Sequence, residues 1–368
     1  MKSLSVIGLM SGSSLDGADL AWVDFIFEQT DQLELKSWNI CHGDTVEYSP
    51  EWQKRLKNAP SLSGKDLWQL HSDLGHLFGQ QISDFIKKIG QKPDFIASHG
   101  HTVFHFPETK STTQIGDGAA IAAELNMIVI DQFRALDIAL GGQGAPLAPL
   151  GDQYFLPQYF ACLNLGGISN ISVKTPNGYK AFDVGGANQV LNALVEEINL
   201  PYDDKGQLAR RGKLIPSLLK QVNSLAYFHQ NYPKSLGNDW VQTKMLPLFQ
   251  DKSQALNDRL HTACVQIAQQ IGKDLKKVIE QENLDINNTD KILISGGGAF
   301  NDFLCELILK EIQPIQKGEA NERMIAFKEA AFIALAGALR WLEQPNVLPK
   351  VTGARRAAVG GAIHYGRI

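Results

Sequence analysis

The chain has 368 residues, of which 44% are hydrophobic and 20% charged, and its formal net charge is −4. This length predicts two lobes, because a single hydrophobic core rarely grows beyond about 250 residues. A slightly acidic protein offers no positive field for a phosphate backbone, which excludes nucleic acid as an expected partner. The four cysteines are far apart, which favours a reducing compartment. The N-terminal residues resemble neither a signal peptide nor a membrane span, so we expect a cytoplasmic protein without membrane attachment.

The first third of the chain has the pattern of an α/β lobe. Strands predicted at residues 3–9 and 20–27 flank a glycine turn and are expected to form a hairpin. Apolar residues at helical spacing predict a long amphipathic helix over residues 63–89. A short buried strand at residues 94–98 is expected to lead into a loop, HGHTVFHFP, and another strand is predicted at residues 127–130.

The rest of the chain repeats this beginning. Strand patterns at residues 162–165, 171–173 and 181–184 surround a second glycine turn and indicate two related halves. The segment 134–151 is rich in glycine and proline but low in charge, and is expected to line a cleft between lobes. The later elements are predicted as helices at residues 189–198, 213–228, 258–280 and 327–342, and a strand at residues 291–295.

Three glycine-rich turns each follow an apolar, strand-like run: GLMSGSSLDG, LNLGGISN and ILISGGGAFN. Glycines at a strand end leave backbone N–H groups accessible to phosphate oxygens. The first turn adds hydroxyl donors and carboxylates that suit Mg²⁺, namely Ser11, Ser13, Ser14, Asp16 and Asp19. A single such turn usually marks only a change of direction, but three indicate a split nucleotide-phosphate site. The absence of a GK[ST] lysine argues against a Walker ATPase.

Longer motifs extend this pattern over nearly the whole chain. They are GLMSGSSLDGADL, SHGHTVFHFP, TTQIGDGAAIA, DQFRALDIALGGQGAPLAPL, NLGGISNIS, FDVGGAN, SGGGAFN, KEAAFIALA and LPKVTGARR. In these motifs the chain resembles the anhydro-N-acetylmuramic acid kinase family, within the actin-like ATPase superfamily that also contains sugar kinases.

The resemblance implies an α/β, two-lobed actin-like ATPase fold (ribonuclease H-like) with a central cleft. Residues 1–133 with about 355–368 are expected to form the N-terminal lobe, and residues 134–354 the C-terminal lobe. The implied enzyme is a kinase that uses ATP and Mg²⁺, hydrolyses the 1,6-anhydro bond of anhydro-N-acetylmuramic acid and phosphorylates O6. Its product is N-acetylmuramate 6-phosphate, in the recycling of peptidoglycan. A homodimer is also implied.

The resemblance assigns catalytic and nucleotide-binding roles to individual residues. Asp183 is the expected general base for the attacking water, and an aspartate that caps its own turn is the alternative. Asp16 is expected to bind Mg²⁺ through water. The remaining nucleotide-binding residues are Ser11, Gly12, Ser13 and Ser14 at the γ-phosphate, Gly166 and Gly167 in the second phosphate hairpin, and Gly296, Gly297, Gly298 and Asn301 beneath the adenine and ribose. A plain GGG turn is the alternative for the last group.

The substrate-binding residues are expected to be Arg134, Glu329 and His99. Arg134 matches an arginine that clamps the lactyl carboxylate, with a surface salt bridge as the alternative. Glu329 is expected to line the sugar site; the alternative is that it only stabilises its helix by interacting with the helix dipole. His99 is expected to hydrogen bond near the sugar; with His101 and His105 it also suggests a metal site, although no further ligands complete one. Lys234 either supports the phosphates or is solvated in a loop, and the sequence leaves this open.

Several residues depart from the family pattern. Val184 and Gly186 replace a threonine and a proline beside Asp183, Asn238 replaces an arginine, and Gly151 with Asp152 stands where a histidine usually follows. These changes leave open a kinase for another amino sugar. A non-catalytic nucleotide-binding module of the same fold has no need of a base, and a dinucleotide-dependent oxidoreductase needs a GxGxxG turn that opens a helix.

Overall fold

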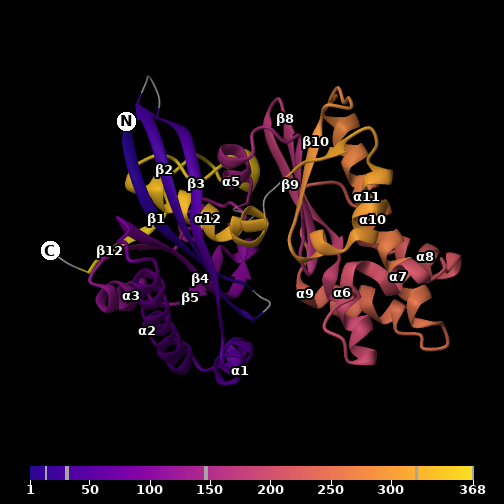
Figure 1. Ribbon diagram of the computed structural model, residues 1–368, viewed down its shortest axis with the longest axis horizontal. Helices are drawn as coiled ribbons and strands as arrows, with labels where there is room; N and C mark the ends of the chain where they lie inside the picture. Colours follow the sequence, from indigo (N-terminus) through magenta and orange to yellow (C-terminus); the bar gives the residue numbers. More distant parts are fainter. Residues whose placement is uncertain (13–14, 30–32, 145–147, 320–321, 367–368) are drawn as a thin grey trace. The chain divides into compact units, whose positions relative to one another are not determined.

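The computed structural model describes residues 1–12, 15–29, 33–144, 148–319 and 322–366 (Figure 1). The chain divides into two compact units: unit 1 comprises Met1–Phe155 and Asn321–Ile368, and unit 2 comprises Leu156–Ala320. This division differs from the expected boundaries, which assigned all of residues 134–354 to the second lobe. The physical reason is that α12 (Glu322–Trp341) packs against the strands of unit 1, and α5 (Ala148–Phe155) packs against α12.

Unit 1 is built on a mixed sheet with the strand order β12-β6-β4-β1-β2-β3, and β5 pairs with β4. The strands are β1 (Lys2–Ser11), β2 (Gly17–Gln29), β3 (Leu33–Glu47), β4 (Phe95–Phe106), β5 (Ser111–Ile115), β6 (Ile128–Asp131) and β12 (Ala362–Tyr365). The predicted hairpin is confirmed, because β1 and β2 pair antiparallel with Ser11 opposite Ala18. The loop expected after residue 98 is wrong: β4 continues to Phe106, since residues His101–Phe106 pair with β5.

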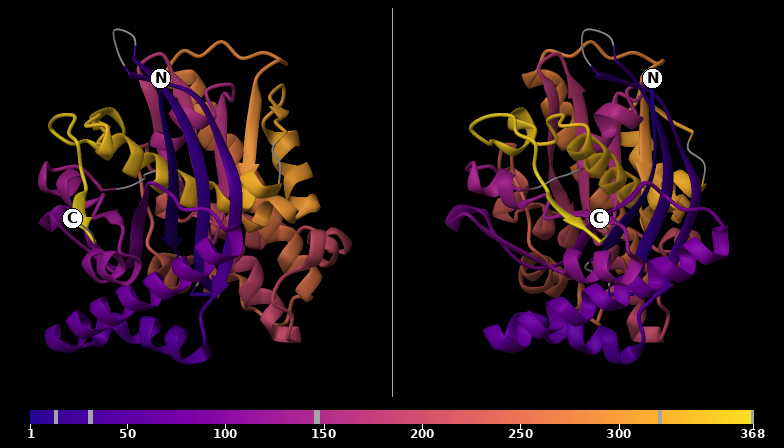
Figure 2. Two further views of the ribbon diagram at one scale, coloured as in Figure 1. Left: turned by 60° about the vertical axis from the view of Figure 1, so that its left-hand side comes forward. Right: turned by 90° about the vertical axis from the view of Figure 1, so that its left-hand side faces the viewer.

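Helices cover both faces of this sheet. They are α1 (Pro50–Asn58), α2 (Gly64–Ile89), α3 (Gly118–Leu125), α4 (Ala135–Ala139), α5, α12 and α13 (Pro349–Thr352). The predicted helix over residues 63–89 is confirmed as α2, and Ser63 caps its N-terminus. On β1, Ile7 and Leu9 pack with the apolar face of α2 in one core. The alternate residue Gly8 faces α12 so closely that a Cβ would lie 1.9 Å from the Ala330 carbonyl oxygen. Figure 2 shows α12, in yellow, against these indigo strands.

Unit 2 is built on a sheet with the strand order β11-β10-β7-β8-β9. Its strands are β7 (Ala161–Leu165), β8 (Ile168–Thr175), β9 (Gly178–Gly186), β10 (Lys291–Ser295) and β11 (Gln316–Lys317). Its helices are α6 (Asn188–Val195), α7 (Gln207–Arg211), α8 (Pro216–Asn223), α9 (Asn238–Trp240), α10 (Leu256–Gln281) and α11 (Asp302–Glu311). The predicted strand at residues 291–295 is confirmed as β10. The helix expected over residues 213–228 is shorter, because α8 begins at Pro216 and ends at Asn223.

The two sheets share one topology. In unit 1 the antiparallel strands β3, β2 and β1 continue into parallel pairs of β1 with β4 and of β4 with β6. In unit 2 the antiparallel strands β9, β8 and β7 continue in the same way into parallel β10 and β11. The expectation of two related α/β halves is therefore confirmed.

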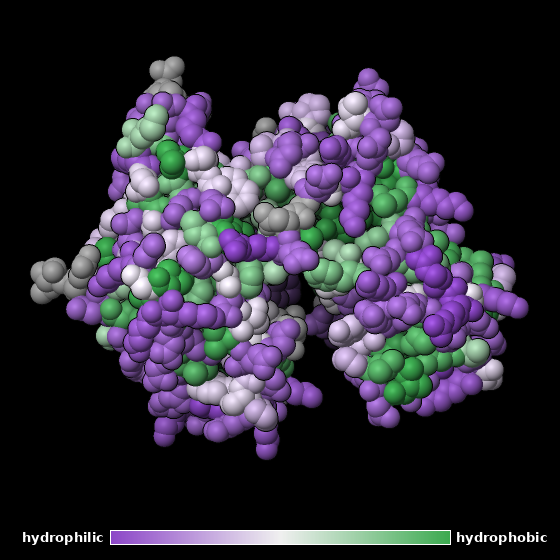
Figure 3. Space-filling model, in the orientation of Figure 1, coloured by the Kyte–Doolittle hydropathy of each residue, from purple (hydrophilic) through white to green (hydrophobic). Residues whose placement is uncertain are grey.

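Figure 3 shows how hydropathy is distributed over one face of the molecule. Hydrophilic side chains cover most of the face seen in Figure 3, and apolar side chains form smaller patches among them. Within the described residues, no helix combines the length and the apolar character needed to cross a membrane.

Candidate active site

The tip of the β1–β2 hairpin begins at Ser11 and Gly12; the predicted residues Ser13 and Ser14 lie outside the described residues. Ser11 is buried, and its hydroxyl accepts a hydrogen bond of 2.7 Å from the Tyr48 hydroxyl. The same hydroxyl lies 3.0 Å from Nδ1 of His101. Burial lowers the pKa of His101 to about 4, so near pH 7 this ring is neutral and can accept the Ser11 proton. The Ser11 side chain thus ties the start of the turn to β4 and to the residue after β3.

Carboxylates gather beside this turn. Asp16 and Glu329 are exposed, and Asp19 is half-buried on β2. Burial raises the pKa of Asp19 above its ordinary value, and the negative charges of Asp16 and Glu329 add to this. The Thr45 hydroxyl opposes the shift by donating a 2.6 Å hydrogen bond to Oδ1 of Asp19. Among the described residues, no group of three or more His, Cys, Asp and Glu side chains has an arrangement that could hold a metal ion.

Arg134 precedes α4 and is half-buried. Its Nε donates a 2.8 Å hydrogen bond to Nε2 of His99, and its Nη1 donates a 2.6 Å bond to the carbonyl of Gly144. Burial and the nearby guanidinium lower the pKa of His99 to about 3, so this ring stays neutral and accepts at Nε2. Asp137 completes the arrangement. Its Oδ2 accepts a 2.6 Å hydrogen bond from the Gly144 amide, and its Oδ1 accepts a 2.5 Å hydrogen bond from the Thr352 hydroxyl.

These contacts bear on the two interpretations of Arg134. Arg134 is half-buried, and it is in no ion pair with another described residue, which favours the first interpretation over a surface salt bridge. The guanidinium is instead fixed in orientation by a neutral ring and a backbone carbonyl, while the carboxylates of Glu329 and Asp137 act on its charge from further away. A cation held in this way suits the bidentate recognition of a carboxylate.

In unit 2, Asp183 lies on β9 and is half-buried. Its Oδ2 accepts a 2.9 Å hydrogen bond from the Leu236 amide, and its own amide donates 3.0 Å to the Lys234 carbonyl. Its carbonyl accepts 2.7 Å from the Tyr227 hydroxyl. Burial raises the pKa of Asp183 to about 6, although the Leu236 amide and the charge of Lys234 oppose the shift. The alternative of an aspartate that caps its own turn is wrong, since the partners of its carboxylate and amide lie about fifty residues away in sequence.

The open question about Lys234 has a geometric answer. This side chain is buried, and its Nζ lies 2.8 Å from Oδ2 of Asp274 on α10. The ammonium group also lies 4.9 Å from the centre of the Tyr227 ring and 5.8 Å from that of Phe182. Lys234 is therefore not a solvated residue of a loop.

The glycine turns of unit 2 converge at the start of α6. The carbonyls of Gly166 and Gly167, between β7 and β8, accept from the first amides of α6, including that of Asn188 at 3.0 Å. The side-chain Nδ2 of Asn188 donates a 2.9 Å hydrogen bond to the Leu165 carbonyl, and a Cβ on Gly297 would lie 3.4 Å from the same Nδ2. Gly296 adopts a φ of +80°, where a Cβ would lie 2.6 Å from Oδ1 of Asn164. The two turns and the start of α6 thus lie side by side.

Asn301 has a defined local role. Its Oδ1 accepts 3.0 Å from the Leu304 amide and caps the N-terminus of α11. A Cβ on Gly206 would lie only 2.2 Å from that oxygen, so the side chain is closely surrounded. The third glycine turn is thereby joined firmly to α11.

Packing explains three departures from the family pattern. Val184 is buried in the core of unit 2, where a threonine hydroxyl would lack solvent. A Cβ on Gly186 would lie 2.8 Å from Val241 Cγ1, within the same core. In unit 1, a Cβ on Gly151 would lie 1.9 Å from the ring of Phe332, so α5 approaches α12 too closely for a side chain there. Asn238, at the start of α9, is exposed, and no packing contact explains it.

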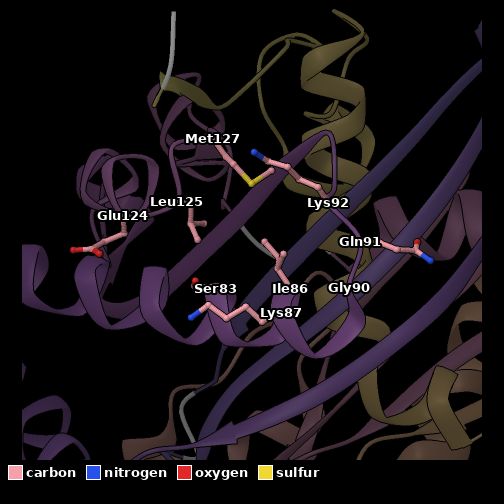
Figure 4. A pocket seen from close by; sticks show the side chains of 9 residues that line it. All are labelled: Ser83, Ile86, Lys87, Gly90, Gln91, Lys92, Glu124, Leu125 and Met127. Atoms are coloured by element: carbon pink, nitrogen blue, oxygen red, sulfur yellow. The ribbon is translucent and has the colours of Figure 1, made fainter.

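An open pocket in unit 1 contains none of the predicted site residues. Its lining includes Ser83, Ile86 and Lys87 of α2, and Glu124 and Leu125 at the end of α3. In Figure 4 the side chain of Gln91 points away from the rest of the lining. The candidate site therefore rests on hydrogen bonds and charges rather than on this pocket.

The structure brings the predicted residues into two groups. In unit 1, Asp16 and Glu329 act on Asp19, and His99 holds Arg134. In unit 2, Gly166 and Gly167 lie beside the Gly296–Gly298 turn. Sequence reasoning missed Tyr48, Asp137, Asn188, Tyr227 and Asp274. Of these, Asp137 lies within the motif DQFRALDIALGGQGAPLAPL and Asn188 is the last residue of FDVGGAN, so these two carried a sequence signal.

The repeated strand order and the glycine turns at its hairpins place the chain in the class of two-unit, actin-like α/β proteins. Residues 4–366 match the family model described as anhydro-N-acetylmuramic acid kinase. The chain belongs to the anhydro-N-acetylmuramic acid kinase family.

Similar curated proteins carry the same name over almost their whole lengths. One from Shewanella sp. (strain ANA-3) is 35% identical and covers 98% of both chains. One from Vibrio vulnificus (strain CMCP6) is 32% identical over 97% of both chains, and one from Bacillus thuringiensis (strain Al Hakam) is 30% identical over 99% of both. Similar solved structures include a ROK family glucokinase from Streptomyces griseus in complex with glucose and AMPPNP, with 12% identity, a TM-score of 0.40 and coverage of 90% of this chain and 98% of that one.

Proposed function

We propose that this protein uses ATP to cleave the 1,6-anhydro bond of anhydro-N-acetylmuramic acid and to phosphorylate O6, giving N-acetylmuramate 6-phosphate. The observation that carries the proposal is the environment of Asp183. A half-buried carboxylate with a pKa raised by burial to about 6 remains ionised at neutral pH and is basic enough to accept a proton. The full-length family match supplies the substrate.

The proposed reaction transfers one proton, forms two bonds and breaks two. Asp183 removes a proton from water as the water oxygen attacks C1 of the sugar. The bond from C1 to O6 breaks, and the electron pair on O6 forms the new bond to the γ-phosphorus while ADP leaves. The Leu236 amide holds Oδ2 of Asp183, so that Oδ1 is the oxygen we assign to the water proton.

Arg134 is proposed to bind the lactyl carboxylate. His99 and the Gly144 carbonyl hold the guanidinium plane, and no described protein group accepts from Nη2. Because His99 is neutral, it contributes no competing positive charge and serves to orient Arg134. Glu329, exposed on α12, is proposed to accept a hydrogen bond from a sugar hydroxyl.

The nucleotide is proposed to bind at the glycine turns. Ser11 and Gly12, together with Ser13 and Ser14, are assigned to the γ-phosphate, with the Ser11 side chain anchoring the turn through Tyr48 and His101. In unit 2, Gly166 and Gly167 are assigned to phosphates. The Gly296–Gly298 turn is assigned to the adenine and ribose, with Asn301 fixing that turn at α11.

A magnesium ion held through water, rather than by a cluster of protein ligands, is proposed beside the carboxylates of unit 1. Burial raises the pKa of Asp19, the charges of Asp16 and Glu329 add to this, and a divalent cation would relieve their repulsion. Asp16 is the residue we propose to hold the ion, through water. When bound, Mg²⁺ would neutralise charge on the phosphate oxygens during transfer.

The experiment that tests this function measures ADP release with ATP and Mg²⁺, with and without anhydro-N-acetylmuramic acid. We expect sugar-dependent ADP and a sugar product heavier by phosphate plus water, as identified by mass spectrometry. Asp183→Asn is expected to lose both. A product heavier by phosphate alone would identify a kinase for another sugar, and the absence of sugar-dependent ADP would contradict the proposal.

We also propose a cytoplasmic homodimer, on the family resemblance. Light scattering after size-exclusion chromatography measures the mass directly, and a mass near 40.5 kDa, that of one chain, would contradict the dimer.

A further inference from the structure

We infer that the buried ion pair of Lys234 and Asp274 positions Asp183 and keeps its carboxylate ionised, so that Lys234 acts on the base rather than on a phosphate. This inference rests on the proposed role of Asp183 as the general base.

The first support is the position of Lys234 in the backbone around Asp183. The Lys234 carbonyl accepts from the Asp183 amide at 3.0 Å, and two residues later the Leu236 amide donates to Oδ2 of Asp183 at 2.9 Å. The segment from Lys234 to Leu236 thus holds Asp183 at its main chain and at its side chain. Whatever fixes this segment also fixes the direction of the catalytic carboxylate.

The second support is the ion pair that fixes the segment. Lys234 Nζ lies 2.8 Å from Oδ2 of Asp274, and the two side chains are only 2% and 4% exposed. Asp274 lies on α10, which packs against β9, so the pair joins the segment to the helix behind the strand of Asp183. The Tyr227 and Phe182 rings cover the ammonium group at 4.9 and 5.8 Å. A lysine enclosed in this way has no route for its Nζ to a phosphate without breaking a buried pair.

The third support is electrostatic. Lys234 lowers the pKa of Asp183 against the effect of burial. Burial lowers the pKa of Lys234 itself, and Asp274 opposes that shift, so the pair stabilises the charge that acts on Asp183. The other titratable groups acting on this cluster are Lys273 and Lys277 of α10 and the Tyr227 phenol.

The test replaces both charges at once. Lys234→Met alone would leave a buried carboxylate unpaired, whereas Lys234→Met with Asp274→Leu exchanges the pair for apolar groups of similar size, which is often neutral for stability. We expect this double variant to unfold near the wild-type temperature. We also expect the acid limb of its kcat-against-pH profile to move upward by about one pH unit, with an unchanged KM for ATP.

Two further variants separate charge from packing. Lys234→Arg keeps the charge, so its acid limb is expected to remain at the wild-type pH even where kcat falls. Lys276→Met removes an exposed lysine from the same helix and is the matched control, with an unchanged profile expected. A wild-type acid limb in the double variant, or an equal shift in Lys234→Arg, would overturn the inference. A raised KM for ATP with an unmoved limb would instead identify Lys234 as a phosphate ligand.

A carbon-13 titration of the Asp183 carboxyl, assigned with Asp183→Asn, measures the same shift without turnover. An upward shift in the double variant supports the inference even if the protein shows no activity on the sugar. If the wild type shows no sugar-dependent ADP release, only the proposed function is contradicted. If the pKa of Asp183 is unshifted in the double variant, only this inference is contradicted.

Discussion

Replacing Asp183 with asparagine is expected to remove activity and to increase stability. The pKa of this carboxyl rises from 3.8 to about 6 because burial disfavours its charge. A shift of about two pH units corresponds to about 3 kcal/mol of cost for the ionised form, as an upper limit. Asparagine avoids this cost and keeps an oxygen for the Leu236 amide, so we expect a gain on the order of 2 kcal/mol in the free energy of unfolding near pH 8.

The expected gain in the free energy of unfolding depends on pH. A carboxyl whose pKa is raised in the folded state destabilises the fold above that pKa and ceases to do so below its unfolded value. The advantage of Asp183→Asn is therefore expected to be full above about pH 7 and to vanish as the pH falls through about 6 towards 4. In Asp183→Asn, kcat is expected to be about 10²- to 10⁴-fold lower than in the wild type.

Urea unfolding of the wild type and the variant at several pH values measures the difference, alongside ADP release. Asp285→Asn, at an exposed aspartate of unit 2, is the matched control and is expected to change neither quantity. A stability gain that does not depend on pH, or a variant less stable than the wild type near pH 8, would refute the reasoning about buried charge. Retained activity would refute the assignment of the base.

Three other perturbations test separate parts of the structure. Gly8→Ala is expected to lower the free energy of unfolding by at least about 3 kcal/mol, because its Cβ would lie 1.9 Å from the Ala330 carbonyl oxygen. Gly64→Ala is the control, since its Cβ meets nothing within 4 Å. Equal losses of stability in the two variants, measured by urea unfolding, would contradict the prediction. His99→Ala is expected to raise KM for the sugar about tenfold by freeing Arg134, with little change in KM for ATP, and an unchanged sugar KM would count against that assignment. Chelation with EDTA is expected to stop ADP release and Mg²⁺ to restore it, whereas release that persists in EDTA would exclude the proposed ion.

Much of the local structure could be predicted because its signals lie within short stretches of chain. The apolar spacing of residues 64–89 and the glycine turn after β1 depend on neighbours a few positions away. The fold class and family followed from such motifs, and Asp183 was singled out in this way. The compact units divide at other residues than the expected lobes, because α12 packs against β1, more than 300 residues earlier in the chain.

The partners of the predicted residues could not be inferred in the same way. Residues 40 positions apart form the ion pair of Lys234 with Asp274, and 35 positions separate Arg134 from His99. No periodicity connects such pairs, since they meet only where the packing of helices on the sheets brings their side chains together. Residue types and turns were readable from the linear chain because they are local; the environment that raises the pKa of Asp183 and encloses Lys234 depends on burial, which exists only once the chain has folded.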